Sequence, residues 1–136
     1  MKALLAIATL WLVGALMVIP SVAADKEDLD HLEKRVNQLN AAAQKPGMMD
    51  IALQRISTET GVPVERVREQ HKKHPEIGAA GLMIANVLAN ETQKRPEQFL
   101  NQKASGKKWL PIAKENKVTV DKLNERLDRL ARAMKG

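Results

Sequence analysis

Two histidines that lie close together in the chain are the first candidates for chemistry. His71 and His74 are three residues apart, and Glu69 and Glu76 are nearby. Imidazoles and carboxylates bind copper, nickel and zinc, so the sequence offers His71 and His74 as candidate metal ligands. Only two imidazoles converge, however, their spacing is not the i, i+4 of a helical zinc pair, and Pro75 is expected to end the helix. The sequence favours a solvated helix end here, and we expect no bound metal or cofactor.

Side chains suited to covalent catalysis are scarce. The chain contains no cysteine, which removes thiol nucleophiles, thiolate metal sites and disulfides together. Beyond residue 24 the serines are Ser57 and Ser105, and neither lies in a Gly-x-Ser-x-Gly turn or beside a histidine in sequence. We therefore predict no catalytic residue and no small-molecule substrate, and we expect a protein that is not an enzyme.

A group of basic residues around one tryptophan could bind an anionic polymer. Lysines neutralise phosphates, and an aromatic ring can stack on a base. A competing interpretation places Trp109 in the core, because it stands three residues before Ile112 on the apolar stripe of a short helix, and the sequence favours that interpretation. The candidate polyanion patch consists of Lys103, Lys107, Lys108, Trp109 and Lys114.

Charge is distributed unevenly along the chain, whose net charge is +6. From Asp25 to Glu33 five acids stand against Lys26 alone, a balance of −4. From Lys34 onward 20 Lys and Arg residues stand against 11 acids, a balance of +9. A basic body attracts nucleic acid, acidic polymers or an anionic membrane surface through a field that salt screens, although a solvated face explains the same charges.

The first 24 residues have the order of a secretory signal peptide. Lys2 is followed by a charge-free run over residues 3–19, then by Pro20 and small residues. We expect cleavage after Ala23 or Ala24, which would leave a periplasmic or secreted mature chain. The run of about 17 residues lies at the lower limit for spanning a bilayer, so an inner-membrane anchor over residues 3–19 is the alternative.

Residues 25–136 are predicted to form a small all-α domain. This length supports one modest core, and the core must be aliphatic because tyrosine is absent and Phe99 is the only phenylalanine. Strands favour aromatic and β-branched residues, so this composition disfavours a sheet. We expect an N-terminal amphipathic helix over residues 25–45 and a helical domain over residues 46–136.

The segment 25–45 carries apolar residues at spacings of three and four, which is a heptad arrangement. The pattern lasts little more than two heptads, which is short for an independent coiled coil. Either the helix packs on the rest of the domain or it pairs with a second copy. The heptad seam consists of Leu29, Leu32, Val36, Leu39 and Ala43, and its four larger residues are the candidate oligomer contacts.

Turn signals divide residues 46–136 into short helices. Asp50 is a candidate cap for a helix that ends at Gly61, Pro63 begins the next, and Thr119 is a candidate cap for the last. A longer apolar segment from Pro75 through Leu88 is the best candidate for the central helix. Small residues along it would let a neighbouring helix approach closely.

One pattern occurs three times in this region. An acid is followed six residues later by a second acid and eight residues later by an apolar residue. We interpret the pattern as a helix-turn-helix unit in which the first acid closes one helix and the second lies near the positive start of the next. The acid pairs are Glu59 and Glu65, Glu91 and Glu97, and Glu115 and Asp121.

The last of these units resembles the helix-turn-helix of bacterial transcription regulators. Ile112-Ala113 is followed by polar residues, by Val118 and by the capping residue Thr119, although Lys117 stands where glycine is usual. The stretch from Ser105 to Val118 also resembles a segment of uncharacterised exported bacterial helical proteins. The resemblance implies a fold element, and a signal peptide would separate the chain from chromosomal DNA.

These observations predict an exported, non-enzymatic helical interaction or structural protein. Its expected partner is another protein or a second copy, bound through the N-terminal helix. The alternative is an exported polyanion or nucleic-acid binding protein that uses the basic body.

Overall fold

The computed structural model describes residues 19–135, with side chains from Lys26 to Lys135. Within that range the chain forms helices and no strand, which confirms the predicted all-α class. The helices in chain order are α2 (Ile19–Ala43), α3 (Met48–Thr60), α4 (Val64–Lys73), α5 (Gly78–Thr92), α6 (Pro96–Ala104), α7 (Trp109–Glu115) and α8 (Val120–Lys135).

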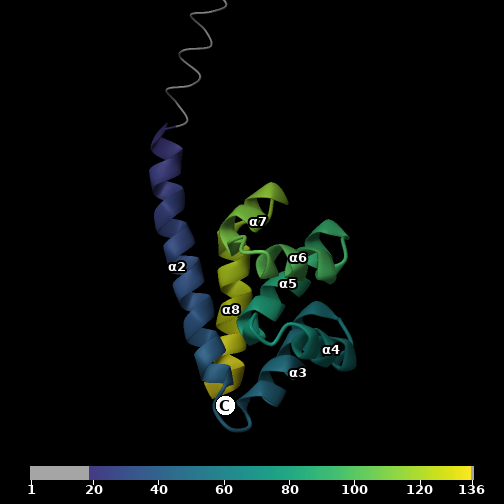
Figure 1. Ribbon diagram of the computed structural model, residues 1–136. Coiled ribbons are helices and arrows are strands. Elements are labelled where there is room, and N and C mark those ends of the chain that lie inside the picture. Colours follow the sequence, from purple (N-terminus) through teal and green to yellow (C-terminus); the bar gives the residue numbers. More distant parts are fainter. Residues whose placement is uncertain (1–18, 136) are drawn as a thin grey trace, which may run out of the picture.

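Helix α5 is the central helix, as the apolar segment predicted. All its residues from Gly78 to Ala89 are buried, and α2, α3, α4, α6 and α8 pack around it (Figure 1). A helix that is apolar on every side requires such surroundings. It begins at Gly78 rather than at Pro75, because a turn precedes it in which the Ile77 amide donates to the carbonyl of His74 at 3.1 Å.

The start of α5 is held by a side chain of α2. Asn40 accepts a hydrogen bond from the Ala80 amide at 2.8 Å and donates one to the carbonyl of Ile77 at 3.0 Å. The first amides of a helix have no partner within the helix, so Asn40 acts as a cap from a distant part of the chain. Gly78 permits this approach, since a Cβ there would lie 2.3 Å from Cγ of Asn40.

We expect Gly78→Ala to destabilise the fold more than Gly61→Ala. Both glycines have a left-handed backbone, with φ of 76° and 75°, and an alanine in that conformation costs about 1–2 kcal/mol. A Cβ at Gly61 meets nothing within 4 Å, whereas one at Gly78 meets Asn40, which adds an overpacking cost of about 1–3 kcal/mol. Urea unfolding of the two variants measures the difference, and equal losses would contradict the role given to this contact.

Helix α2 packs on the body through the heptad seam. Leu32, Val36 and Ala43 are buried, and Leu29 and Leu39 are partly buried against the same core. Of the two arrangements that the seam allowed, the structure has the one within the chain. Pairing with a second copy through the same residues would require α2 to leave the body, so we do not retain this seam as an oligomer contact.

The N-terminal helix begins earlier than predicted. Its described part runs from Ile19, and Pro20, expected to break a helix, lies within it. Residues 1–18 of the predicted signal peptide, and most of the alternative anchor, lie outside the described residues. Among the helices that the structure describes, none is both long enough and apolar enough to cross a membrane.

Two predicted caps have different outcomes. Thr119 caps α8, since its hydroxyl accepts a hydrogen bond from the Lys122 amide at 3.3 Å. Asp50 does not cap α3, because the helix begins two residues earlier, at Met48, and places Asp50 in its first turn. The turn before α3 is closed instead by the Met48 amide, which donates to the carbonyl of Lys45 at 3.0 Å.

Three interhelical turns lie where the acid pairs predicted them. In each, the first acid lies in the last turn of one helix and the second in the first turn of the next. A residue with a left-handed backbone follows two positions after the first acid, at Gly61, Gln93 and Lys117. Just before it, a side chain bonds back to a carbonyl four residues earlier: Thr60 to Ile56, Thr92 to Leu88 and Asn116 to Ile112. That the three pairs are copies of one unit stays a prediction.

Candidate functional site

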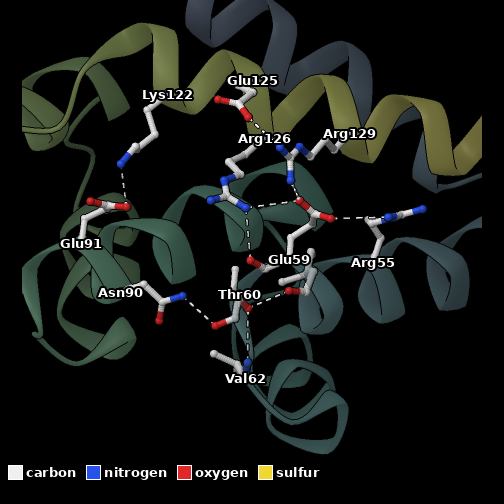
Figure 2. A network of polar contacts seen from close by, with 11 residues as sticks. Arg55, Glu59, Thr60, Val62, Asn90, Glu91, Lys122, Glu125, Arg126 and Arg129 are labelled. Atoms are coloured by element: carbon white, nitrogen blue, oxygen red, sulfur yellow. Dashed lines mark hydrogen bonds and ion pairs between the residues drawn. The ribbon is translucent and has the colours of Figure 1, made fainter.

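The carboxylate of Glu59 joins α3 to α8 (Figure 2). One of its oxygens accepts hydrogen bonds from Arg126 at 3.2 Å and from Arg129 at 2.8 Å, and the other lies 3.4 Å from Arg55. Arg126 also donates to the backbone carbonyl of Glu59 at 3.3 Å. The Glu59 side chain is only 9% exposed, so water screens these charges less than at an open surface.

The three arginines keep Glu59 ionised. Burial by itself raises the pKa of Glu59, but the hydrogen bond and charge of Arg129 outweigh it, together with contributions from Arg55 and Arg126. The resulting pKa lies below the ordinary value of 4.5. The same contact raises the pKa of Arg129. At neutral pH the group is therefore a fixed negative charge that holds α8 in place.

A second carboxylate, Glu33 of α2, caps α7. One oxygen accepts a hydrogen bond from the Trp109 backbone amide at 3.0 Å, and the other accepts one from Lys103 at 2.7 Å. A carboxylate is favourable at a helix start, where the amides lack partners and the helix dipole is positive. Glu33 thereby connects α2 with α6 and α7.

A buried amide pair fixes α4 against α5. Gln70 and Asn86 exchange hydrogen bonds of 3.2 Å and 2.8 Å, and Asn86 also donates to the carbonyl of Leu82 at 2.8 Å. Both side chains are buried, so each needs the other to avoid an unsatisfied polar group. Sequence analysis missed this pair, although an asparagine within an apolar helix was a signal for it.

The predicted polyanion patch has no stacking ring. Trp109 is 0% exposed, which confirms its place in the core and leaves no face for a base. Two of the lysines bind carboxylates of the chain itself: Lys103 binds Glu33, and Lys107 binds Glu115. Lys108 and Lys114 are exposed. We do not retain the patch in the form that the sequence predicted.

The two candidate metal ligands lie at the end of α4. The helix ends at Lys73, and His74 follows it with its Nδ1 atom 3.6 Å from a carboxylate oxygen of Glu76. His71 is half-buried, and its Nδ1 atom has no hydrogen-bond partner among the described residues. In the part of the chain that the structure describes, no three His, Asp or Glu side chains are grouped so that they could hold a metal ion.

One shallow hollow on the surface combines an apolar side chain with charged groups of both signs. Among residues 26–135, Ile51 is the only large apolar side chain that is exposed, at 41%. It lies in this hollow with Arg55 and Arg68. The hollow is formed by α3, α4 and the end of α8. We term it the arginine hollow; it is lined by Asp50, Ile51, Gln54, Arg55, Thr58, Arg68 and Ala133.

A group of unpaired acidic side chains lies in the N-terminal half of α2. The first turns of this helix extend beyond the body, at the end opposite to the start of α3 (Figure 1). Three carboxylates of the turns that follow, where Leu29 packs on the core, are exposed and have no ion-pair partner among the described residues. We term them the acidic arm; they are Glu27, Asp28 and Asp30.

The polar side chains with the best-defined geometry thus each join two helices. Glu59 holds α3 to α8, Glu33 holds α2 to α7, and Gln70 holds α4 to α5. No protein-family model, curated protein or solved structure matches the chain. The function must therefore be inferred from the geometry and the sequence alone.

Proposed function

We propose that the mature chain is an exported, non-catalytic helical interaction protein. The observation that carries the proposal is that the polar side chains Glu59, Glu33 and Gln70 each join two helices. A body fixed in this way presents a rigid outer surface, and a rigid surface binds a protein partner with little loss of conformational freedom. The exposed charged groups without an ion-pair partner among the described residues include those of the acidic arm and Arg68 in the arginine hollow.

Export is supported by the order of residues 1–24 and is compatible with the packing of α2. Cleavage after Ala23 or Ala24 would remove only the first residues of this helix. The seam that packs on the body begins at Leu29, beyond either cut. The mature chain would therefore keep every contact described for α2.

We expect the protein isolated from its native envelope to begin at Ala24 or Asp25. We also expect a photo-reactive amino acid at an exposed position to form a covalent adduct with a protein partner. A photo-reactive amino acid at Ile51 probes the arginine hollow, and one at Asn101, also exposed, is the matched control position. Mass spectrometry reads both the mature terminus and the adduct. The adduct at residue 51 should exceed that at residue 101, since only the first lies in the hollow.

Three results would contradict this expectation. Intact Met1 in a membrane fraction would establish the anchor in place of cleavage. A nucleic acid or polysaccharide adduct would favour the polyanion binder, whose binding should weaken steeply as salt is raised. Equal adducts at the two positions would remove the hollow as a binding surface.

The polyanion alternative has one supporting observation, the charge balance of +9 beyond Glu33. The burial of Trp109 weighs against it, because the aromatic platform for a base is not accessible. The interaction protein therefore stands as the conclusion.

A further inference from the structure

We infer that two copies of this protein associate through the arginine hollow, each copy presenting the same hollow to the other. The inference rests on the proposed function and names the partner as a second copy of the chain. It follows from three side chains that line the hollow together, an acid, a base and an exposed apolar side chain, which are Asp50, Arg68 and Ile51.

The hollow contains one unpaired charge of each sign. Asp50 of α3 and Arg68 of α4 are both exposed. Neither has an ion-pair partner among the described residues, although both line the same hollow. The other charged group of the hollow, Arg55, is bound to Glu59. Asp50 and Arg68 are therefore the charges that this surface offers to a partner.

A surface with one unpaired charge of each sign is complementary to itself. When two identical surfaces meet about a two-fold axis, a residue on one side of the axis faces the residue that lies on the opposite side in the partner. An axis that passes between Asp50 and Arg68 places the acid of each copy against the base of the other, so the same ion pair forms twice. A nucleic acid or an anionic membrane would match only the base, which favours a second copy as the occupant.

Ile51 supplies the apolar part of the contact. Among residues 26–135 it is the only large apolar side chain that is exposed, at 41%, and it adjoins Asp50 in the first turns of α3. Its burial against a second copy favours association independently of charge. The hollow is shallow and the contact is small, so we infer a dimer that exchanges with the monomer rather than a permanent one. Helix α2 keeps its place on the body in both states.

The test uses the mature protein purified from its native envelope and sedimentation velocity over a range of protein and salt concentrations. Two variants, Asp50→Arg and Arg68→Asp, each reverse one charge of the hollow. A third variant, Ile51→Ser, removes the apolar contact. The matched control is Arg66→Asp, since Arg66 is exposed on the same helix as Arg68 but borders a different recess.

We expect the unmodified protein to form dimers whose fraction rises with protein concentration and falls as salt is raised. Each charge-reversed variant should dimerise at least about tenfold more weakly, because like charges then meet twice in the contact. Ile51→Ser should weaken the dimer at low and at high salt, since its effect does not depend on charge. The Arg66→Asp control should dimerise like the unmodified protein.

An equimolar mixture of Asp50→Arg and Arg68→Asp is the decisive sample. In the mixed dimer the two basic side chains of one copy face the two acidic side chains of the other, so both ion pairs form again. The mixture should therefore recover the dimer that neither variant forms well alone. Substitutions that only disturbed the folding of their own chain would show no recovery on mixing.

Four outcomes would overturn the inference: a monomer at every concentration, assemblies that grow beyond the dimer, equal effects of Arg66→Asp and Arg68→Asp, or no recovery in the mixture. A monomer that still forms an adduct with a different protein through residue 51 would leave the proposed function intact and remove only self-association. A monomer that binds anionic vesicles through Arg68 would likewise reject the second copy as the occupant of the hollow.

Discussion

Trp109→Ala is expected to lower the free energy of unfolding by about 3–5 kcal/mol. The side chain is fully buried, and its ring lies against α5, where a Cβ at Gly81 would be 3.4 Å from it. Alanine would leave a cavity among helices that are already fixed by polar contacts, so the surroundings have little freedom to collapse. A domain of this size has about 5–15 kcal/mol in total, which makes the loss a large part of its stability.

Urea unfolding of the mature chain measures this loss, with Lys108→Ala as the matched control. Lys108 is the exposed neighbour of Trp109, so its replacement should change stability by no more than about 0.5 kcal/mol. After cleavage Trp109 is the only tryptophan, and its fluorescence should be blue-shifted and poorly quenched by iodide. A red-shifted, readily quenched tryptophan with an unchanged unfolding curve would restore the polyanion patch.

Glu59→Gln is expected to lower the free energy of unfolding by about 2–3 kcal/mol. Removing one member of a fully buried ion pair costs about 3–5 kcal/mol, because a charge is left without its partner. Here Arg126 and Arg129 are 27% and 44% exposed, so water compensates part of that loss. Glu125→Gln is the control, since Glu125 is 57% exposed and pairs with Arg129 alone, and such surface pairs contribute about 0–1 kcal/mol.

The pH dependence of this variant has a defined sign. The pKa of Glu59 is lower in the folded state than its ordinary value of 4.5. Its contribution to stability is therefore fully present above that ordinary value and is lost as the pH falls through the lowered, folded pKa. Chemical unfolding across this range should show the unmodified protein and Glu59→Gln converging in acid. A stability difference that stays constant down to the acid limit would contradict the assigned role of the charge.

The elements of this fold were accessible from the sequence because their signals are local. Apolar residues from Pro75 to Leu88 predicted the central helix, and the stripe shared with Ile112 predicted the burial of Trp109. Lys117 shows the limit of such reasoning. It stands where glycine is usual, yet it takes the left-handed backbone that normally favours glycine, with φ of 59°.

The polar contacts of the candidate site could not be predicted in the same way. Glu59 meets Arg126 across 67 positions of the chain, and Glu33 meets the Trp109 amide across 76. Such pairs depend on which helices become neighbours, and no local pattern carries that information. The acid at position 59 was recognised as a helix end, but its arginine partners follow only from the docking of α8 on α3.

The contacts of α2 also determine when this helix can be stabilised. Its Asn40, Glu33 and Arg35 reach partners 40, 76 and 93 positions later in the chain. Contacts between residues so distant in sequence form slowly, because a long loop must close first. Helix α2 therefore gains its last partners only when α8 has been completed, because Arg35 pairs with Asp128. In an exported chain, the full set of α2 contacts would form only after the C-terminal helix has crossed the membrane.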